Sequence, residues 1–230
     1  RARGLGDVYK RQFWECDDLY ELFRGFVKNI KLIDTFETGS LKFGILKNRL
    51  VHFFSSNSKL GSKKNIQAHY DLGNDFFKLF LDDTMTYSSA IFESRNSSLK
   101  EASINKLDLI CKKLNLNETD HVLEIGGGWG SFAIHAAQNY GCEVTTTTIS
   151  EEQYQYMNQR FSKLNLNKKI NLLNKDYRSL SGNYDKIVSI EMIEAVGDKF
   201  LGTFFSTCSK LLKSKGQMLL QSITMPDYRY

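Results

Sequence analysis

The sequence contains few cysteines and no long apolar run. Its four cysteines, Cys16, Cys111, Cys142 and Cys208, are scattered without the spacing of a metal or redox motif. This spacing favours a reducing cytosol over a disulfide framework. No apolar run approaches the ~18 residues that a membrane-spanning helix needs, and no secretory signal is visible. Any contact with a membrane would therefore be peripheral.

The sequence also has little excess charge once its first residues are set aside. The stretch RGLGDVYKRQ corresponds to the translation of a transposase adapter used in sequencing libraries, so we interpret residues 1–12 as an adapter-derived remnant. Without them the formal net charge falls from +5 to +2. Residues 13–66 carry nine basic against six acidic residues, and residues 67–230 carry eighteen against nineteen. This balance gives no argument for a nucleic-acid partner.

What remains is enough for a globular protein with a real core, because 41% of the residues are hydrophobic and 13% are aromatic. Helical spacing of apolar residues in Leu19–Ile33 and Leu41–Phe54 predicts an N-terminal helical region over residues 13–66. The stretch SSNSKLGSKKN then reads as a linker. Two more helices are predicted, at Ile66–Leu81 and Leu99–Leu114.

After Asp120, short β-branched runs alternate with segments of helical length. This alternation predicts a doubly wound, mostly parallel α/β sheet with helices on both faces, in a domain of residues 67–230. The only proline, Pro226, closes the last strand. The predicted strands are residues 121–125, 143–149, 170–174, 186–190 and 216–223, and the predicted helices are Gly130–Tyr140, Glu151–Leu164 and Lys199–Leu212.

The first of these strands runs into a glycine-rich turn, VLEIGGGWG. Ligands of doubly wound sheets bind outside the carboxyl ends of the strands, and Gly126 and Gly128 permit backbone conformations that a Cβ forbids. A dinucleotide fingerprint would read G-x-G-x-x-G, with an acid after the second strand. Here the spacing is G-x-G-x-G, the second strand ends in four threonines, and Glu124 supplies an acid. This arrangement favours S-adenosylmethionine, with its ammonium beside Glu124.

The flanking stretches carry a resemblance to a known family. The stretch HYDLGNDFFKLFLDDTMTYSSA precedes the sheet, and VLEIGGGWG, TTTISEEQ, NKDYRSL and MIEAVG follow it in that order. Together they resemble the cyclopropane fatty acyl phospholipid synthase and mycolic acid cyclopropane synthase family over about residues 66–224. The resemblance implies a Rossmann-like class I methyltransferase fold. It also implies an S-adenosylmethionine-dependent enzyme that adds a one-carbon unit to the double bond of an unsaturated phospholipid acyl chain.

The resemblance also implies cofactor contacts in this chain. Ordinary structural roles stay open for several of them: Tyr87 as a core aromatic, Thr148 as a strand residue, Gln153 as a helix-surface residue and Asp176 as a loop cap. In addition to Glu124, the implied cofactor contacts are Tyr87, Ser88, Gly126, Gly128, Thr148 and Gln153, with Asp176 and Tyr177 flanking the adenine.

The family's active site holds a bicarbonate ion, and this chain departs from its pattern there. Ser89 replaces a cysteine and Gln221 a histidine, whereas Glu194 and Ile223 are retained. Ala195 replaces a histidine, Gly127 replaces a common cysteine, and the family's tyrosine would lie beyond Tyr230. The backbone N–H of Ser89 and the amide of Gln221 can still bind an anion, so bicarbonate stays a candidate ligand. Because Gln221 cannot take up a proton, ring closure is in question, whereas methyl transfer is not.

Methyl transfer to an alkene creates a carbocation, which aromatic faces stabilise by about 2 kcal/mol when desolvated. Tyr87, Phe92 and Phe205 are candidates, although Phe92 and Phe205 also suit an ordinary core. Glu194 is the predicted general base, directly or through bicarbonate, with a helix-capping role as its alternative. Loss of a proton from the added methyl gives a cyclopropane, and loss from a neighbouring carbon gives a methylene branch.

A lipid substrate implies a cytoplasmic protein that is peripheral at the inner membrane face. The basic residues of 13–66, interleaved with aromatics, suit an anionic leaflet, and an ordinary solvated appendage is the alternative. A homodimer is compatible with the sequence. Two other functions stay open: a methyltransferase of soluble small molecules, and a non-catalytic adenosylmethionine-binding relic. The basic residues of 13–66 that would face an anionic leaflet are Lys28, Lys31, Lys42, Lys47 and Arg49.

The usual methyltransferase sheet has two more strands than the five predicted here. We therefore expect a gene fragment that lacks its C-terminal strands. We also expect such a fragment, on its own, to expose a sheet edge and to aggregate or bind lipid poorly.

Overall fold

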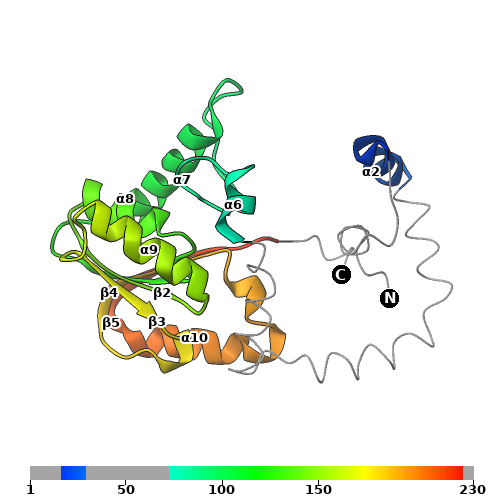
Figure 1. The fold of residues 1–230 in the computed structure, drawn as a ribbon. Coiled ribbons are helices and arrows are strands. Elements are labelled where there is room, and N and C mark those ends of the chain that lie inside the picture. The colour runs from blue at the N-terminus through cyan, green and yellow to red at the C-terminus, as the bar shows by residue number, and fades with distance from the viewer. Residues whose placement is uncertain (1–16, 30–72, 225–230) are drawn as a thin grey trace. The chain divides into compact units, whose positions relative to one another are not determined.

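The computed structural model describes residues 17–29 and 73–224 (Figure 1). The chain divides into two compact units, residues 1–56 and 57–230. In the first unit, helix α2 spans Leu19–Lys28, and the side chain of Asp18 caps it by accepting from the Glu21 N–H at 2.9 Å. The helix begins where it was predicted and ends at Lys28, earlier than predicted. The predicted helix Leu41–Phe54 and the linker lie outside the described residues.

The second unit is built on a parallel sheet, as predicted. Its strand order is β3-β2-β1-β4-β5, and each described pair of neighbours is parallel. The chain order reverses between β1 and β4, which creates the crevice where doubly wound sheets bind ligands. The strands are β1 His121–Ile125, β2 Glu143–Thr148, β3 Ile170–Asn174, β4 Tyr184–Ile190 and β5 Leu212–Gln221.

Helices cover both faces of this sheet (Figure 1). Successive residues of a strand point to opposite faces, so Val122 packs in the core under α7, α8 and α9, whereas Leu123 packs under α10. Both side chains are fully buried. The helices are α7 Leu99–Lys113, α8 Ser131–Asn139, α9 Glu151–Lys163 and α10 Leu201–Leu211.

Several predicted boundaries differ from the observed ones, and the largest differences are in α6, α10 and β5. The helix predicted over Ile66–Leu81 is described only as α6, Gly73–Lys78. A turn follows it, in which the Phe80 N–H donates to the Phe77 carbonyl at 3.3 Å. The helix predicted from Lys199 begins at Leu201, because residues 198–200 form a 3-10 turn. The last strand begins at Leu212 and ends before residue 222, and Pro226 lies outside the described residues.

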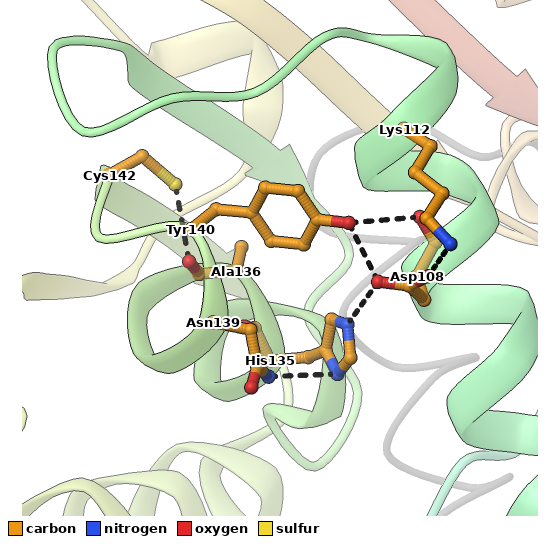
Figure 2. A network of polar contacts seen from close by, with 7 residues as sticks. All are labelled: Asp108, Lys112, His135, Ala136, Asn139, Tyr140 and Cys142. Carbon is orange, nitrogen blue, oxygen red and sulfur yellow. Dashed lines mark hydrogen bonds and ion pairs between the residues drawn. The ribbon is translucent and has the colours of Figure 1, made fainter.

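Helices α7 and α8 are joined by a network of polar contacts around Asp108 (Figure 2). Its carboxylate accepts from the Tyr140 hydroxyl at 2.6 Å and pairs with the Lys112 ammonium at 2.6 Å. His135 Nε2 lies 3.6 Å from the same carboxylate. The hydrogen bonds from Lys112 and Tyr140 lower the pKa of Asp108, and burial lowers the pKa of His135 despite the neighbouring charge.

We expect Asp108→Asn to lower the free energy of unfolding by about 1 kcal/mol, because an amide cannot keep both the Tyr140 bond and the Lys112 ion pair. Urea unfolding at neutral pH measures the change. Asp83→Asn is the control, since its ion pair with Lys100 is exposed and a change within about 0.5 kcal/mol is expected there. Equal losses in the two variants would contradict the role of the network.

The described cysteines Cys111, Cys142 and Cys208 are buried and free, and Cys16 lies outside the described part. Among the helices described, none is long and apolar enough to cross a membrane.

Candidate active site

A cavity of about 990 Å³ lies at the carboxyl ends of the strands. Its walls come from the residues that follow β1, β2, β3 and β4, from residues 80–92, and from α7. The cavity thus lies at the reversal of strand order, where the sequence places the glycine-rich turn.

Glycines are required in this turn for two different reasons. Gly126 has a φ of +86° and Gly128 a φ of +56°, as the sequence predicts for a special backbone. Gly127 does not have a positive φ, but a Cβ added there would lie 2.1 Å from Thr146 Oγ1. A Cβ added at Gly126 would also lie too close to its neighbours, 2.7 Å from Met192 Cγ. A Cβ added at Gly128 would have no atom within 4 Å. The protein's own packing excludes side chains at the first two positions, and only Gly128 faces open space.

Glu124 is the penultimate residue of β1 and lines the cavity, although its exposed fraction is only 3%. Its Oε2 accepts from the Thr146 hydroxyl at 2.6 Å. Burial raises the pKa of Glu124 to about 7, and the Thr146 bond and the Lys106 charge oppose that rise. A cationic ligand bound in the cavity would therefore favour the ionised form.

This raised pKa predicts a pH dependence of stability. Between pH 4.5, the ordinary pKa of the group, and about pH 7, the unfolded chain is ionised at Glu124 and the folded one is protonated. The free energy of unfolding should therefore fall as pH rises through this window, by up to about 3 kcal/mol. Urea unfolding at pH 5 and pH 8 should show a smaller difference in Glu124→Gln than in the unchanged protein or in the surface variant Glu152→Gln. An undiminished difference in Glu124→Gln would contradict the assignment.

Residues 73–92 are held against the glycine turn. Trp129 Nε1 donates to Asn74 Oδ1 at 2.7 Å, and its ring packs against Phe77 with a centroid distance of 4.8 Å. Arg160 of α9 donates to the carbonyl oxygens of Thr84, at 2.9 Å, and Trp129, at 3.2 Å. These contacts bring residues 85–90 to the cavity. Sequence reasoning did not single out Trp129 or Arg160.

The cofactor residues expected from the sequence lie together around this cavity. Thr148 donates to Gln153 Oε1 at 2.8 Å, and both side chains are buried, so Gln153 is not a helix-surface residue. Asp176 receives two hydrogen bonds from the Arg178 guanidinium, at 2.8 and 2.6 Å, and caps the turn that follows it. Their roles in binding stay predictions. The lining residues of this set are Tyr87, Ser88, Glu124, Gly126, Gly128, Thr148, Gln153, Asp176 and Tyr177.

The residues predicted for the chemical step also meet here. Ser89, Glu194 and Ile223 line the cavity with Tyr87, and Gln221, at the end of β5, bonds to Ser89 Oγ at 3.1 Å. The Ile223 N–H donates to Glu194 Oε1 at 2.6 Å.

The two other aromatic candidates differ in position. Phe92 lines the cavity, whereas Phe205 is not among the lining residues and packs on Phe204 with a centroid distance of 5.3 Å. Phe92 and Phe205 are both about half exposed, so the reading of either as ordinary core is wrong.

Two charged residues of the site were missed by sequence reasoning. Glu191 follows β4 and accepts from the Ser89 N–H at 2.9 Å and from Gln221 Nε2 at 2.8 Å. Lys106 lies in α7, is only 1% exposed, and donates to the Ser88 hydroxyl. Burial lowers the pKa of Lys106 to about 8, opposed chiefly by the charge of Glu191. A lysine on the buried face of a predicted helix was the available signal for Lys106.

The parallel sheet, its reversal point and the glycine turn define the fold of class I S-adenosylmethionine-dependent methyltransferases. The family described as mycolic acid cyclopropane synthetase matches residues 57–230, and the chain belongs to that family.

Individual relatives agree with this assignment. The chain is 36% identical to the cyclopropane-fatty-acyl-phospholipid synthase of Escherichia coli K12, over 96% of this chain and 56% of the relative. The structure of the cyclopropane synthase MmaA2 from Mycobacterium tuberculosis superposes with a TM-score of 0.70 and 36% identity, over 73% of this chain and 59% of that one. The mycolic acid cyclopropane synthase CmaA1, complexed with SAH and CTAB, gives 0.66 and 38%, over 69% and 55%. The chain thus spans somewhat more than half the length of these relatives.

Proposed function

We propose that this protein transfers a one-carbon unit from S-adenosylmethionine to the double bond of an unsaturated phospholipid acyl chain. The observation that carries the proposal is that the glycine turn and Glu124 line the same cavity of about 990 Å³ as Ser89 and Glu194. A cavity of this size suits the donor together with a length of acyl chain.

Donor binding is supported by the charge and shape of the cavity. Glu124 offers a buried carboxylate to a cationic ligand, and the open space at Gly128 permits close approach to the backbone. The structure of CmaA1, to which the chain is similar, is a complex with SAH. SAH is the product that remains when the donor gives up its methyl group.

The apolar part of the cavity suits an alkyl chain. Phe80, Phe92 and Leu99 line it and are 40–53% exposed. An isolated alkene is a weak nucleophile, so it must be held in line with the sulfonium methyl in a dry site. Tyr87 and Phe92 offer aromatic faces to the carbocation that follows.

The test uses the full-length protein, S-adenosylmethionine with a labelled methyl group and vesicles of a monounsaturated phospholipid. Mass spectrometry should find acyl chains heavier by one CH₂ group that carry the label. The form of the product, a ring or a branch, is read from the same spectra after fragmentation. Label on a polar amine or phenol and none on lipid would favour a soluble small-molecule methyltransferase. Donor binding without any modified acceptor would favour a non-catalytic relic.

A lipid substrate also requires contact with a bilayer. We infer peripheral association with an anionic, cytoplasm-facing leaflet, supported by the excess of basic residues in positions 13–66. Flotation with anionic and with neutral vesicles tests it, and equal binding to both would contradict it. Binding of a bicarbonate ion beside the donor, and a homodimer, stay predictions.

A further inference from the structure

Three polar residues from distant parts of the chain meet at the carboxyl ends of β4 and β5. One atom, Glu191 Oε1, accepts from the Ser89 N–H at 2.9 Å, the Ser89 hydroxyl at 3.0 Å and Gln221 Nε2 at 2.8 Å. Gln221 Nε2 also donates to Ser89 Oγ at 3.1 Å. For Glu191 Oε2, no donor is recorded among residues 17–29 and 73–224. Oε1 therefore already accepts three hydrogen bonds, whereas Oε2 is available to accept a proton.

The backbone of Glu191 is fixed as well. Its N–H donates to the Gln221 carbonyl at 2.8 Å, and its φ is +46°. A residue with a side chain pays about 1 kcal/mol or more for such a conformation, which persists only where the surroundings hold it. The carboxylate is thus held in a defined position, and Glu191 and Ser89 both line the cavity.

The donors expected to hold a separate anion are already used by carboxylates of this chain. The Ser89 N–H and the Gln221 amide bond to Glu191, and the Ile223 N–H bonds to Glu194. A bicarbonate ion would have to displace Glu191 and would lie beside two negative charges, which repel it. The buried ammonium of Lys106 stabilises the carboxylate that is already present, because its charge acts on Glu191.

We propose that the Glu191 carboxylate is the general base of the reaction and takes the place of an exogenous anion. The inference rests on the proposed function. In the first step, the S–CH₃ bond breaks with its electron pair left on sulfur, and the alkene electrons form the new C–C bond. In the second step, Glu191 Oε2 takes a proton from the carbocation, and the electrons of that C–H bond close the ring or form a double bond. The proton then passes from Glu191 to water.

Gln221 and Ser89 are positioning residues in this scheme. Gln221 carries no titratable proton, so it orients Glu191 without relaying a proton. Their bonds to Oε1 leave Oε2 to receive one.

The test compares the full-length protein with Glu191→Gln and Glu191→Gly in buffer freed of carbon dioxide. The unchanged protein should form its acyl product at the same rate with and without added bicarbonate. Glu191→Gln keeps the shape but accepts no proton, and should lose at least 100-fold in product formation while its affinity for S-adenosylhomocysteine changes less than threefold. Glu191→Gly adopts the positive φ without strain and leaves the Ser89 and Gln221 donors free to bind an anion. Added bicarbonate should therefore raise the rate of product formation by this variant at least tenfold.

Each alternative outcome has a separate meaning. Product formation by the unchanged protein that requires bicarbonate would overturn this inference and leave the proposed function intact. Full activity of Glu191→Gln, with a large loss in Glu194→Gln, would overturn it in favour of Glu194. A loss of S-adenosylhomocysteine binding in Glu191→Gln, together with a Glu191→Gly variant that bicarbonate does not rescue, would reduce Glu191 to a structural role. Absence of any acyl product from the unchanged protein would overturn the proposed function itself.

Discussion

Replacing Gly127 by alanine is expected to lower the free energy of unfolding by about 3 kcal/mol, because the new Cβ would lie 2.1 Å from Thr146 Oγ1. Thr146 is fully buried and holds Glu124 by a hydrogen bond of 2.6 Å, so it cannot move without disturbing the carboxylate. We expect the same variant to bind S-adenosylhomocysteine at least tenfold more weakly. Urea unfolding and calorimetry measure the two effects.

A double-mutant cycle makes this prediction specific. Thr146→Ala removes the clashing hydroxyl, so Gly127→Ala should cost at least 1 kcal/mol less in the Thr146→Ala background than in the unchanged protein. Gly128→Ala is a useful comparison, since nothing lies within 4 Å of its Cβ and only the positive φ opposes it. Additive losses at Gly127 and Thr146 would show that the glycine is required for another reason.

Replacing Trp129 by alanine should lower the free energy of unfolding by about 3–5 kcal/mol. Trp129 is only 2% exposed, packs with Phe77 and Tyr87, and bonds to Asn74. Loss of the ring also frees residues 85–90 from the glycine turn, so we expect product formation to fall more than stability alone explains. Assays well below the unfolding midpoint separate the two effects.

Two further variants divide the contribution of Trp129. Trp129→Phe keeps most of the packing and loses the bond to Asn74, and should cost about 1–2 kcal/mol. Asn74→Ala removes the same bond from the other side and should cost a similar amount. If Trp129→Ala cost no more than Asn74→Ala, the ring would not be what holds this segment.

Prediction from the sequence was most successful where local patterns repeat. Each of the five strands and the helices α7 to α10 was expected near its observed place, because periods of two and of about 3.6 residues mark sheet and helix faces. Boundaries were less predictable. Helix α10 runs directly into β5 at Leu212 without a glycine or proline, so no stop signal marks the change.

The site shows the same division. Gly126, Glu124 and Thr148 line the cavity together, as the sequence led us to expect, because they belong to one turn or one strand end and the topology places such ends together. Phe205 was misplaced because helical spacing alone does not say which side of a helix faces a cavity. Arg160 was missed because its partners, the carbonyl oxygens of Thr84 and Trp129, are backbone atoms that no residue pattern displays.

The sequence by itself determined the parallel sheet, the glycine turn and the family, because each depends on local periodicity or on short ordered motifs. Only the tertiary structure decided which charges meet in the cavity. Gln221 and Ser89 are 132 positions apart, and both bond to Glu191 because the crossovers bring the ends of β4 and β5 beside residues 85–90. Hydrogen-bond partners of this kind depend on side-chain directions within about 3 Å, which packing fixes and sequence spacing does not.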